Sequence, residues 1–328
     1  MKKRTVIILI VLAAIVAALL IGWPLFNRLY YGRSQAATLF AWQFHKDTYT
    51  TETAFEAYIE EKRAENDLFY PAPTESLTLP VDSGSAGDVP YYILNPADSP
   101  QTLLVYFAGG SFIDQPRPVH WQFLESVARD TGATVVLPIY PKLPLSGAAE
   151  AYAVLPDFCG ALFADLPYSE LIFMGDSAGG GMALSLAMQL RDAGSIAPEK
   201  LILLSPWVDV TMENPDIPAY EKKDTALDSA MLARLGELWA EGLSPTDPAV
   251  SPLYGHFEGL GRITLAVGTG ELLYPDIMKL DAALTESGID HDLLVSEGMF
   301  HVWPLYKEYN IPEAQETYSE LIRLISGD

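Results

Sequence analysis

The sequence predicts an α/β fold in which a mostly parallel sheet carries helices on both faces. Two observations lead to this class. After residue 100, short apolar runs alternate with segments of helical length, an order typical of strand-helix-strand units. In addition, residues 171–181 read as a buried strand, a glycine-rich turn and the start of a helix. The 328 residues, 49% of them hydrophobic, suffice for one large core and an accessory region.

The first 33 residues predict a membrane anchor. Residues 6–21 form an unbroken apolar run of 16 residues. Its continuation to residue 26 gives about 30 Å of helix at ~1.5 Å per residue, enough to cross a bilayer core. A cleaved secretory signal is the alternative, but the run exceeds the roughly 7 to 15 apolar residues of a signal, and no small-residue cleavage site follows directly. We therefore expect an uncleaved anchor over residues 1–33.

The side chains that flank the apolar run predict its orientation. Three basic residues and the terminal amine precede the run, whereas two basic residues follow it: Lys2, Lys3 and Arg4 against Arg28 and Arg33. This excess predicts a cytoplasmic N-terminus and an extracytoplasmic remainder. Aromatic side chains suited to a membrane interface follow the run, namely Trp23, Tyr30 and Tyr31.

The net charge of −23 excludes a nucleic-acid-binding protein, because phosphate contacts need a basic surface. Of the 20 basic residues, five precede residue 34, where there is no Asp or Glu. The rest of the chain has 15 basic residues and all 43 acidic residues, so it carries a net charge of about −28.

Cys159, the only cysteine, lies in an apolar stretch and predicts a buried structural thiol. No spacing typical of a metal site or a phosphate loop is present, so we expect neither metal nor cofactor.

The elements after the anchor follow from periodicity and turn residues. Residues 35–66 alternate polar and aromatic side chains, as amphipathic helices do. A polar turn at 83–88 separates the first two expected strands. In chain order we expect strands 77–81, 91–94 and 103–107, helix 121–129, strand 134–139, helix 148–162, strand 171–174, helix 178–192, strand 201–204, helix 230–243, strand 263–267, helix 277–284 and strand 293–295.

Almost sixty residues separate strands 201–204 and 263–267, too many for a simple crossover. We interpret this segment as an insertion that, with residues 35–66, forms a helical cap over an apolar pocket. The chain then divides into an anchor (1–33), an N-terminal cap segment (34–75) and a main domain (76–328) with a cap insertion at about 207–250.

Ser177 is the candidate nucleophile. Gly175-Asp176-Ser177-Ala178-Gly179 fits the G-x-S-x-G nucleophile elbow, in which a strained turn exposes a serine hydroxyl above the end of a sheet. The strand before it and the helix after it supply the context that this motif requires. The glycines avoid clashes where the helix passes close to its neighbouring strand.

His301 is the candidate base, because it follows the last expected strand and completes the chain order serine, acid, histidine. The acid is expected in the loop after strand 263–267, where Glu271 and Asp276 are both available. We favour Glu271, which is closer to the strand end. Asp276 follows Pro275 at a helix start, where a carboxylate caps free amides.

The loop after strand 103–107 is the candidate oxyanion hole. It reads Ala108-Gly109-Gly110-Ser111-Phe112, and bare glycines let its backbone amides approach a substrate. The amide of Ala178, next to the nucleophile, is a further donor.

Together these motifs resemble the hormone-sensitive-lipase-like branch of the α/β-hydrolases, which includes acetyl esterases and arylacetamide deacetylases. The similarity covers roughly residues 75–325 and also includes Ser205-Pro206-Trp207-Val208-Asp209 and Ser251-Pro252-Leu253. It implies an eight-stranded sheet, a helical cap and hydrolysis of carboxylic esters with small or medium acyl chains. By the same resemblance Ser177, Glu271 and His301 match the triad, Gly110, Ser111 and Ala178 match the oxyanion donors, and Gly109 supports their loop.

The chain departs from this family at two places. Ala108 and Ser111 replace the histidine and the third glycine of the His-Gly-Gly-Gly loop, and Glu271 replaces the usual Asp. We expect an intact hole with altered loop support. The alternatives are a serine peptidase or amidase of the same fold, and a catalytically weak binding protein. A small-molecule ester and, through the anchor, a membrane are the expected partners.

Overall fold

The computed structural model describes residues 3–46, 48–49 and 51–327. Lys2 of the predicted anchor lies outside the described residues, as do Asp47 and Thr50 of the predicted cap segment. The main domain is built around one eight-stranded sheet with the order β1-β2-β4-β3-β5-β6-β7-β8. Strand β2 runs antiparallel to β1 and β4, and all other pairs are parallel. The predicted mostly parallel, eight-stranded sheet is therefore confirmed.

The strands are β1 Val81–Ala86, β2 Val89–Leu94, β3 Thr102–Phe107, β4 Thr134–Pro138, β5 Glu170–Asp176, β6 Lys200–Leu204, β7 Arg262–Gly268 and β8 His291–Ser296. The helices are α1 Lys3–Ala17, α2 Trp23–Tyr31, α3 Gln35–Ala41, α4 Glu52–Asn66, α5 Pro118–Thr131, α6 Ala148–Asp165, α7 Ser177–Asp192, α8 Ser229–Trp239, α9 Tyr274–Glu286 and α10 Pro312–Ser326. A π-helical turn, η1 (Ala18–Gly22), joins α1 to α2, and short 3₁₀ turns are η2 (Thr74–Ser76), η3 (Ile217–Ala219), η4 (Pro252–Tyr254) and η5 (Trp303–Tyr309).

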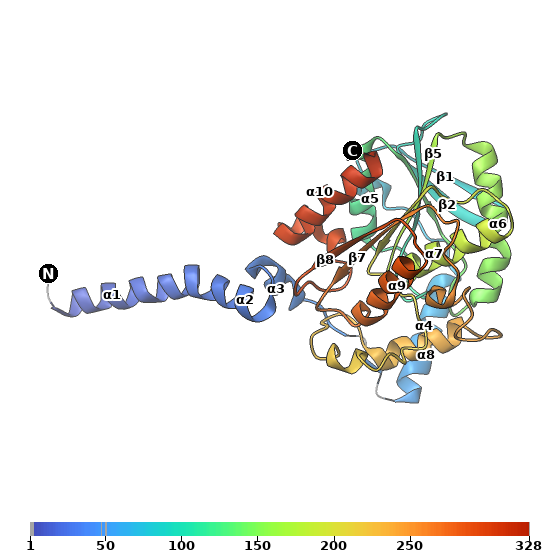
Figure 1. Ribbon diagram of the computed structural model, residues 1–328. Helices are drawn as coiled ribbons and strands as arrows, with labels where there is room; N and C mark the ends of the chain where they lie inside the picture. Colours follow the sequence, from blue (N-terminus) through green and yellow to red (C-terminus); the bar gives the residue numbers. More distant parts are fainter. Residues whose placement is uncertain (1–2, 47, 50, 328) are drawn as a thin grey trace.

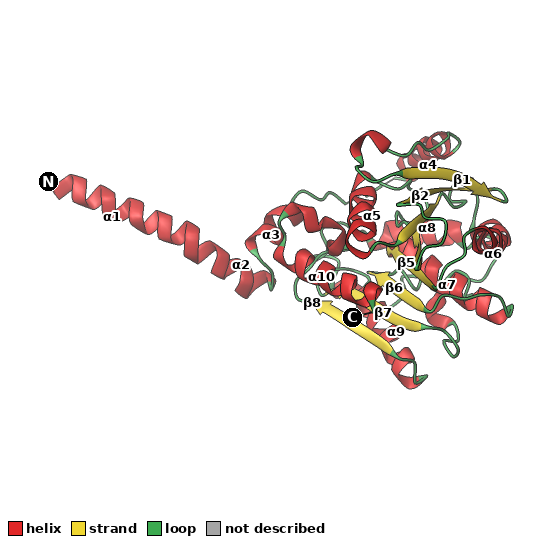
Figure 2. Cartoon of the chain, turned by 90° about the horizontal axis from the view of Figure 1, so that it is seen from above, coloured by secondary structure: helices red, strands yellow, loops and turns green. Residues whose placement is uncertain are grey.

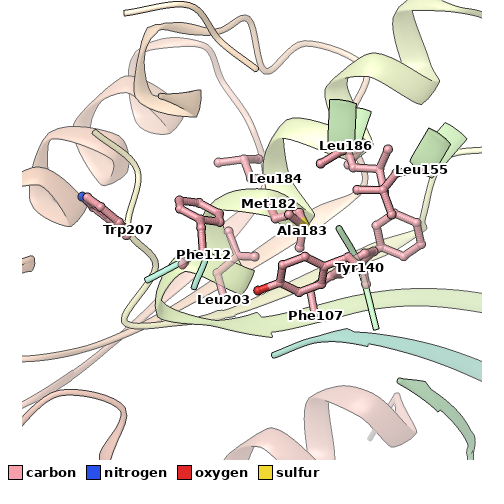
Figure 3. Close-up of a cluster of buried hydrophobic side chains, with 14 of the residues drawn as sticks. Phe107, Phe112, Tyr140, Leu155, Met182, Ala183, Leu184, Leu186, Leu203 and Trp207 are labelled. Atoms are coloured by element: carbon pink, nitrogen blue, oxygen red, sulfur yellow. The ribbon is translucent and has the colours of Figure 1, made fainter. Parts of the chain in front are cut away.

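Helices cover both faces of the sheet, as the order of elements predicts (Figure 2). Buried side chains of α6, α7 and α9 pack on one face, and those of α5 and α10 pack on the other. The first core includes a cluster around Phe107, Met182, Leu186 and Leu203 (Figure 3). The central strands are buried on both faces, which explains why they read as continuous apolar runs.

The first predicted strand is wrong. Residues 77–80 form no strand, and β1 instead occupies most of the predicted turn, leaving only Gly87 and Asp88 between β1 and β2. Four of the six β1 residues are exposed, because this edge strand pairs only with β2. Its polar composition therefore resembles a turn, while Gly87 at φ +56° makes the actual reversal.

Helices α1 and α2 project away from the main domain as one continuous arm (Figure 1). This helix spans the 26 residues from Val6 to Tyr31, and an 18-residue window within it has a mean hydropathy of 3.1. By length and composition it suits a membrane span or a signal sequence.

Helices α4 and α8 lie side by side at the edge of the domain (Figure 1). Arg234 of α8 pairs with Glu52 of α4 at 2.5 Å, and its guanidinium lies 3.5 Å from the ring centre of Phe55. The two segments expected to form a cap are thus in contact. Helix α8 ends at Trp239, four residues before the expected end.

Candidate active site

Ser177 lies at the sharp turn between β5 and α7. Its φ of +52° is a left-handed conformation that costs free energy in a residue with a Cβ. The turn is held because the amide of Trp207 donates to the Ser177 carbonyl at 2.9 Å. A Cβ at Gly179 would collide with the carbonyl oxygen of Phe107, so only glycine lets α7 start this close to β3. The local geometry is that of the predicted elbow.

Glu271 and His301 are brought together by the loops after β7 and β8. Nδ1 of His301 lies 2.6 Å from Oε2 of Glu271, and both side chains are buried. The other carboxylate oxygen, Oε1, accepts hydrogen bonds from Ser205 Oγ and from the Gly268 amide, each at 2.9 Å. Both oxygens of this buried carboxylate are thus satisfied, which fixes its orientation toward the imidazole.

Ser205 is a residue of this site that the sequence analysis did not assign a role. Its hydroxyl donates to Glu271 and accepts from the amide of Val302 at 3.1 Å. One side chain therefore connects the acid loop to the histidine loop. The available signal was its position directly after the buried strand β6, at the same end of the sheet as the candidate triad.

Asp276, the other candidate acid, does not contact His301. Its Oδ1 accepts a hydrogen bond from Asn214 at 2.7 Å, and Lys279 lies 3.7 Å away. It lies in the first turn of α9, but its Oδ1 accepts from Asn214 and its Oδ2 has no hydrogen-bond partner among the described residues, so the expected capping role is wrong. Burial raises the pKa of Asp276 to about 6, with a smaller upward contribution from the nearby charge of Asp209.

Asp224, a third buried carboxylate, connects the predicted cap insertion to the loop of the candidate acid. Its Oδ2 accepts from the Leu272 amide at 2.7 Å, and its Oδ1 accepts from the amides of Ala226 and Leu227. Burial raises the pKa of Asp224, although the nearby His301 and these amides favour the charged form. The residue after the candidate acid is thereby anchored to the segment that covers the site.

The candidate oxyanion loop adopts a strained backbone. Gly110, Ser111 and Phe112 have φ values of +131°, +51° and +58°. The Gly110 carbonyl accepts from the amides of Ile113 and Asp114, both at 2.9 Å. This tight turn directs the loop backbone toward the cavity that Gly110, Ser111 and Ser177 line together.

Asp176, beside the candidate nucleophile, supports the candidate oxyanion loop through a hydrogen bond to its backbone. Its Oδ1 accepts from the Gly109 amide at 2.8 Å and from the Tyr106 hydroxyl at 2.7 Å. Its Oδ2 lies 3.3 Å from Nε2 of His120, whose Nδ1 accepts from the Arg117 amide, so Nε2 carries the proton. Burial opposes the charge of Asp176, but His120 and these hydrogen bonds outweigh it and lower the pKa.

Aromatic side chains support the loop that begins at Ala108. The Tyr140 hydroxyl donates to the carbonyl of Ala108 at 2.6 Å. The Phe112 ring is nearly parallel to that of Trp239, with ring centres 4.2 Å apart, and also stacks on Trp207 at 5.5 Å. Figure 3 shows Phe112, Trp207 and Tyr140 in this cluster. The loop is therefore tied to α8 of the predicted cap.

The cavity above Ser177 has a volume of about 140 Å³. Ser177 and His301 both line it, and the N-terminal segment and α8 supply most of its apolar wall. Those wall residues are Phe44, Tyr58, Met231, Leu232 and Leu235. Asp114 and Arg117 add polar groups at one side. The arrangement provides a serine hydroxyl, a buried imidazole-carboxylate pair and backbone donors around one small pocket.

Comparisons with known proteins identify the family of this chain. A family described as "alpha/beta hydrolase fold" matches residues 104–305. The chain is 30% identical over 246 residues to an acetyl-hydrolase from Streptomyces hygroscopicus, covering 72% of this chain and 80% of the relative. It is 26% identical over 221 residues to an esterase from Acinetobacter venetianus, covering 67% and 73%.

Among solved structures, a hormone-sensitive lipase from a metagenome library has the same fold, with a TM-score of 0.72 and 24% identity over 82% of this chain and 91% of that one. The chain therefore belongs to the α/β-hydrolase fold family.

Proposed function

We propose that the protein is a serine carboxylesterase or deacetylase that forms an acyl-enzyme on Ser177. The observation that carries the proposal is the 2.6 Å contact between His301 and Glu271 beside the cavity that Ser177 lines. The relatives named acetyl-hydrolase and esterase support the same class of reaction.

In the proposed mechanism, Nε2 of His301 removes the proton of the Ser177 hydroxyl as its oxygen attacks the ester carbonyl. Glu271 accepts the Nδ1 proton in a hydrogen bond, which fixes the tautomer and stabilises the imidazolium. His301 then protonates the leaving alcohol. A water molecule, deprotonated by the same imidazole, hydrolyses the acyl-enzyme and regenerates the serine.

The tetrahedral intermediate carries a negative oxygen, which backbone amides stabilise. We assign this role to Gly110, Ser111 and Ala178, and each such donor contributes about 3 kcal/mol to the transition state. Gly109 supports the loop through its bond to Asp176. The fixed bonds around Asp176 keep these donors oriented before the substrate arrives, which is the physical basis of the stabilisation.

The size of the cavity favours small acyl groups. An apolar cavity of about 150 Å³ holds a molecule the size of benzene. The 140 Å³ cavity therefore suits acetyl to butyryl chains, packed against the leucine side chains of α8.

We further propose that residues 1–33 anchor the protein and that the domain lies outside the cytoplasm. The basic residues before the apolar helix support this orientation. In this organisation residues 34–75 and the insertion at about 207–250 form the cap of the 76–328 domain. The contacts between α4 and α8 and the shared cavity wall support that division.

Hydrolysis of p-nitrophenyl acetate and butyrate, compared with the matching p-nitroanilides, tests the proposed reaction. We expect rapid ester cleavage that Ser177→Ala abolishes, and much slower anilide cleavage. Faster anilide cleavage would instead indicate an amidase or peptidase. Binding without turnover of either substrate would indicate a hydrolase-like binding protein.

A further inference from the structure

A second, larger cavity lies where the N-terminal arm meets the main domain. Its volume is about 760 Å³, and three parts of the chain line it: the end of α2 with residues 32–33, the loop before α8, and the loops after β7 and β8. The junction is held by hydrogen bonds from Arg33 to the Gly298 carbonyl at 2.9 Å and from the Ser34 hydroxyl to Glu313 at 2.8 Å. The cavity is thus built by specific contacts between arm and domain.

This cavity is basic in an acidic protein. Four cationic side chains line it, Arg28, Arg33, Lys222 and Lys223, against the single carboxylate of Glu297. Among the described residues, Arg28 and Lys222 form no ion pair, and Lys223 lies only against the Tyr220 ring, 4.6 Å from its centre. The lining therefore carries an excess of positive charge, four cations against one carboxylate.

Most basic side chains elsewhere in the domain are paired with carboxylates. Eleven of the 15 basic side chains beyond residue 34 form ion pairs with described carboxylates. Two of the four others are Lys222 and Lys223. In a chain with a net charge of −23, unpaired cations gathered at one cavity indicate an anionic ligand.

The position of the cavity identifies the kind of anion. A bilayer core of about 30 Å takes up roughly 20 helical residues, so an arm that enters at Val6 leaves the core near Leu25. Arg28 and Tyr30 then lie at the depth of the lipid headgroups, with the Phe26 and Tyr30 rings stacked 5.2 Å apart. At this depth the abundant anion is the lipid phosphate.

We propose that this cavity binds the headgroup of an anionic phospholipid. Arg28, Lys222 and Lys223 contact its phosphate, and Trp42, which also lines the cavity, packs against its glycerol region. The site adjoins the catalytic cavity, since residues 226–228 continue directly from its basic loop into the catalytic wall. The bound lipid therefore holds the catalytic cavity near the membrane surface.

The test uses the full-length chain in detergent micelles, with lipid adducts read by native mass spectrometry. We expect a one-to-one adduct with phosphatidylglycerol and a much weaker one with phosphatidylcholine. Arg28→Gln/Lys222→Gln/Lys223→Gln should weaken phosphatidylglycerol binding on the order of 100-fold, because each of the three basic residues near an anionic headgroup contributes about fivefold. Hydrolysis of a soluble short-chain ester should persist in this variant, which shows that it is folded.

The matched control removes the same charge elsewhere. Arg129→Gln/Lys279→Gln/Arg323→Gln changes three exposed side chains outside the cavity and should leave the adduct unchanged. Equal binding of the two lipids, or equal loss in both triple variants, would overturn the proposal. Displacement of phosphatidylglycerol by millimolar inorganic phosphate would likewise overturn it and indicate a site for a soluble anion.

Discussion

At the scale of single residues, the two candidate acids, Glu271 and Asp276, are both buried but have different environments. Glu271 has donors at both oxygens and contacts His301. Asp276 has one side-chain donor, Asn214, and its Oδ2 has no partner among the described residues. These environments predict different consequences when each charge is removed.

Glu271→Gln should lower kcat by about 10³ to 10⁴ fold with little change in KM, because the amide cannot hold the reactive imidazole tautomer. Asp276→Asn should keep most of the activity, since Asp276 contacts Asn214 rather than His301. Steady-state kinetics on a short p-nitrophenyl ester measure both effects. An inactive Asp276 variant beside an active Glu271 variant would refute the assignment of the acid.

The raised pKa of Asp276 also predicts a pH dependence of stability. The folded state holds the proton up to about pH 6, whereas an unfolded aspartate releases it near 3.8. Protonation of Asp276 therefore contributes fully to the free energy of unfolding below about pH 4. This contribution, about 3 kcal/mol, is lost as the pH rises through 6. Urea unfolding of the wild type and of Asp276→Asn at pH 4 and 7 measures it. Between pH 4 and pH 7 the wild type should lose unfolding free energy relative to the variant. An equal change in unfolding free energy for both proteins would contradict the raised pKa of Asp276.

The sequence predicted the roles of residues that could be identified from their order along the chain relative to the strands. Glu271 and His301 follow successive strands, and the structure brings them into contact. Ser205 and His120 were not assigned because their roles depend on partners 66 and 56 residues away. The capping role expected for Asp276 was wrong because position at a helix start does not determine where a side chain finds its donor.

At the scale of elements, the close packing of α7 on β3 is the feature that forms the elbow. Gly179→Ala would place a Cβ against the Phe107 and Ala108 backbone, so it should cost about 3 kcal/mol of unfolding free energy and most of the activity. Gly160→Ala in α6 is the matched control, because a Cβ there meets no described atom within 4 Å. It should stabilise by up to about 1 kcal/mol. Equal effects of the two changes in urea unfolding would argue against this packing.

The sequence predicted the central elements better than the edge. Strands β3 to β7 are buried on both sides, so their apolar runs indicate them directly. β1 could not be found in this way, because pairing with one neighbour leaves its side chains in solvent and removes the apolar pattern. The contact between α4 and α8 joins segments about 180 residues apart, and periodicity within either segment cannot specify it.

At the scale of the whole molecule, the proposed anchoring by the N-terminal arm places the enzyme at a membrane. We predict that the arm is retained in the mature protein. Intact-mass measurement on chain extracted from membranes should show residues 1–33 in place. A mature chain that begins after residue 26 would establish a cleaved signal instead. The proposed lipid site would then keep Arg28 if cleavage occurs before residue 28, and would lose it if cleavage occurs after that residue.

In the proposed mechanism the elbow, the imidazole-carboxylate pair and the backbone donors act together on Ser177. Reaction of the full-length protein with a fluorophosphonate, followed by peptide mass spectrometry, tests it most directly. We expect a single adduct, on Ser177, whose formation slows strongly in His301→Ala, because the serine then lacks its base. An adduct on another serine, or an active enzyme without an adduct on Ser177, would contradict it.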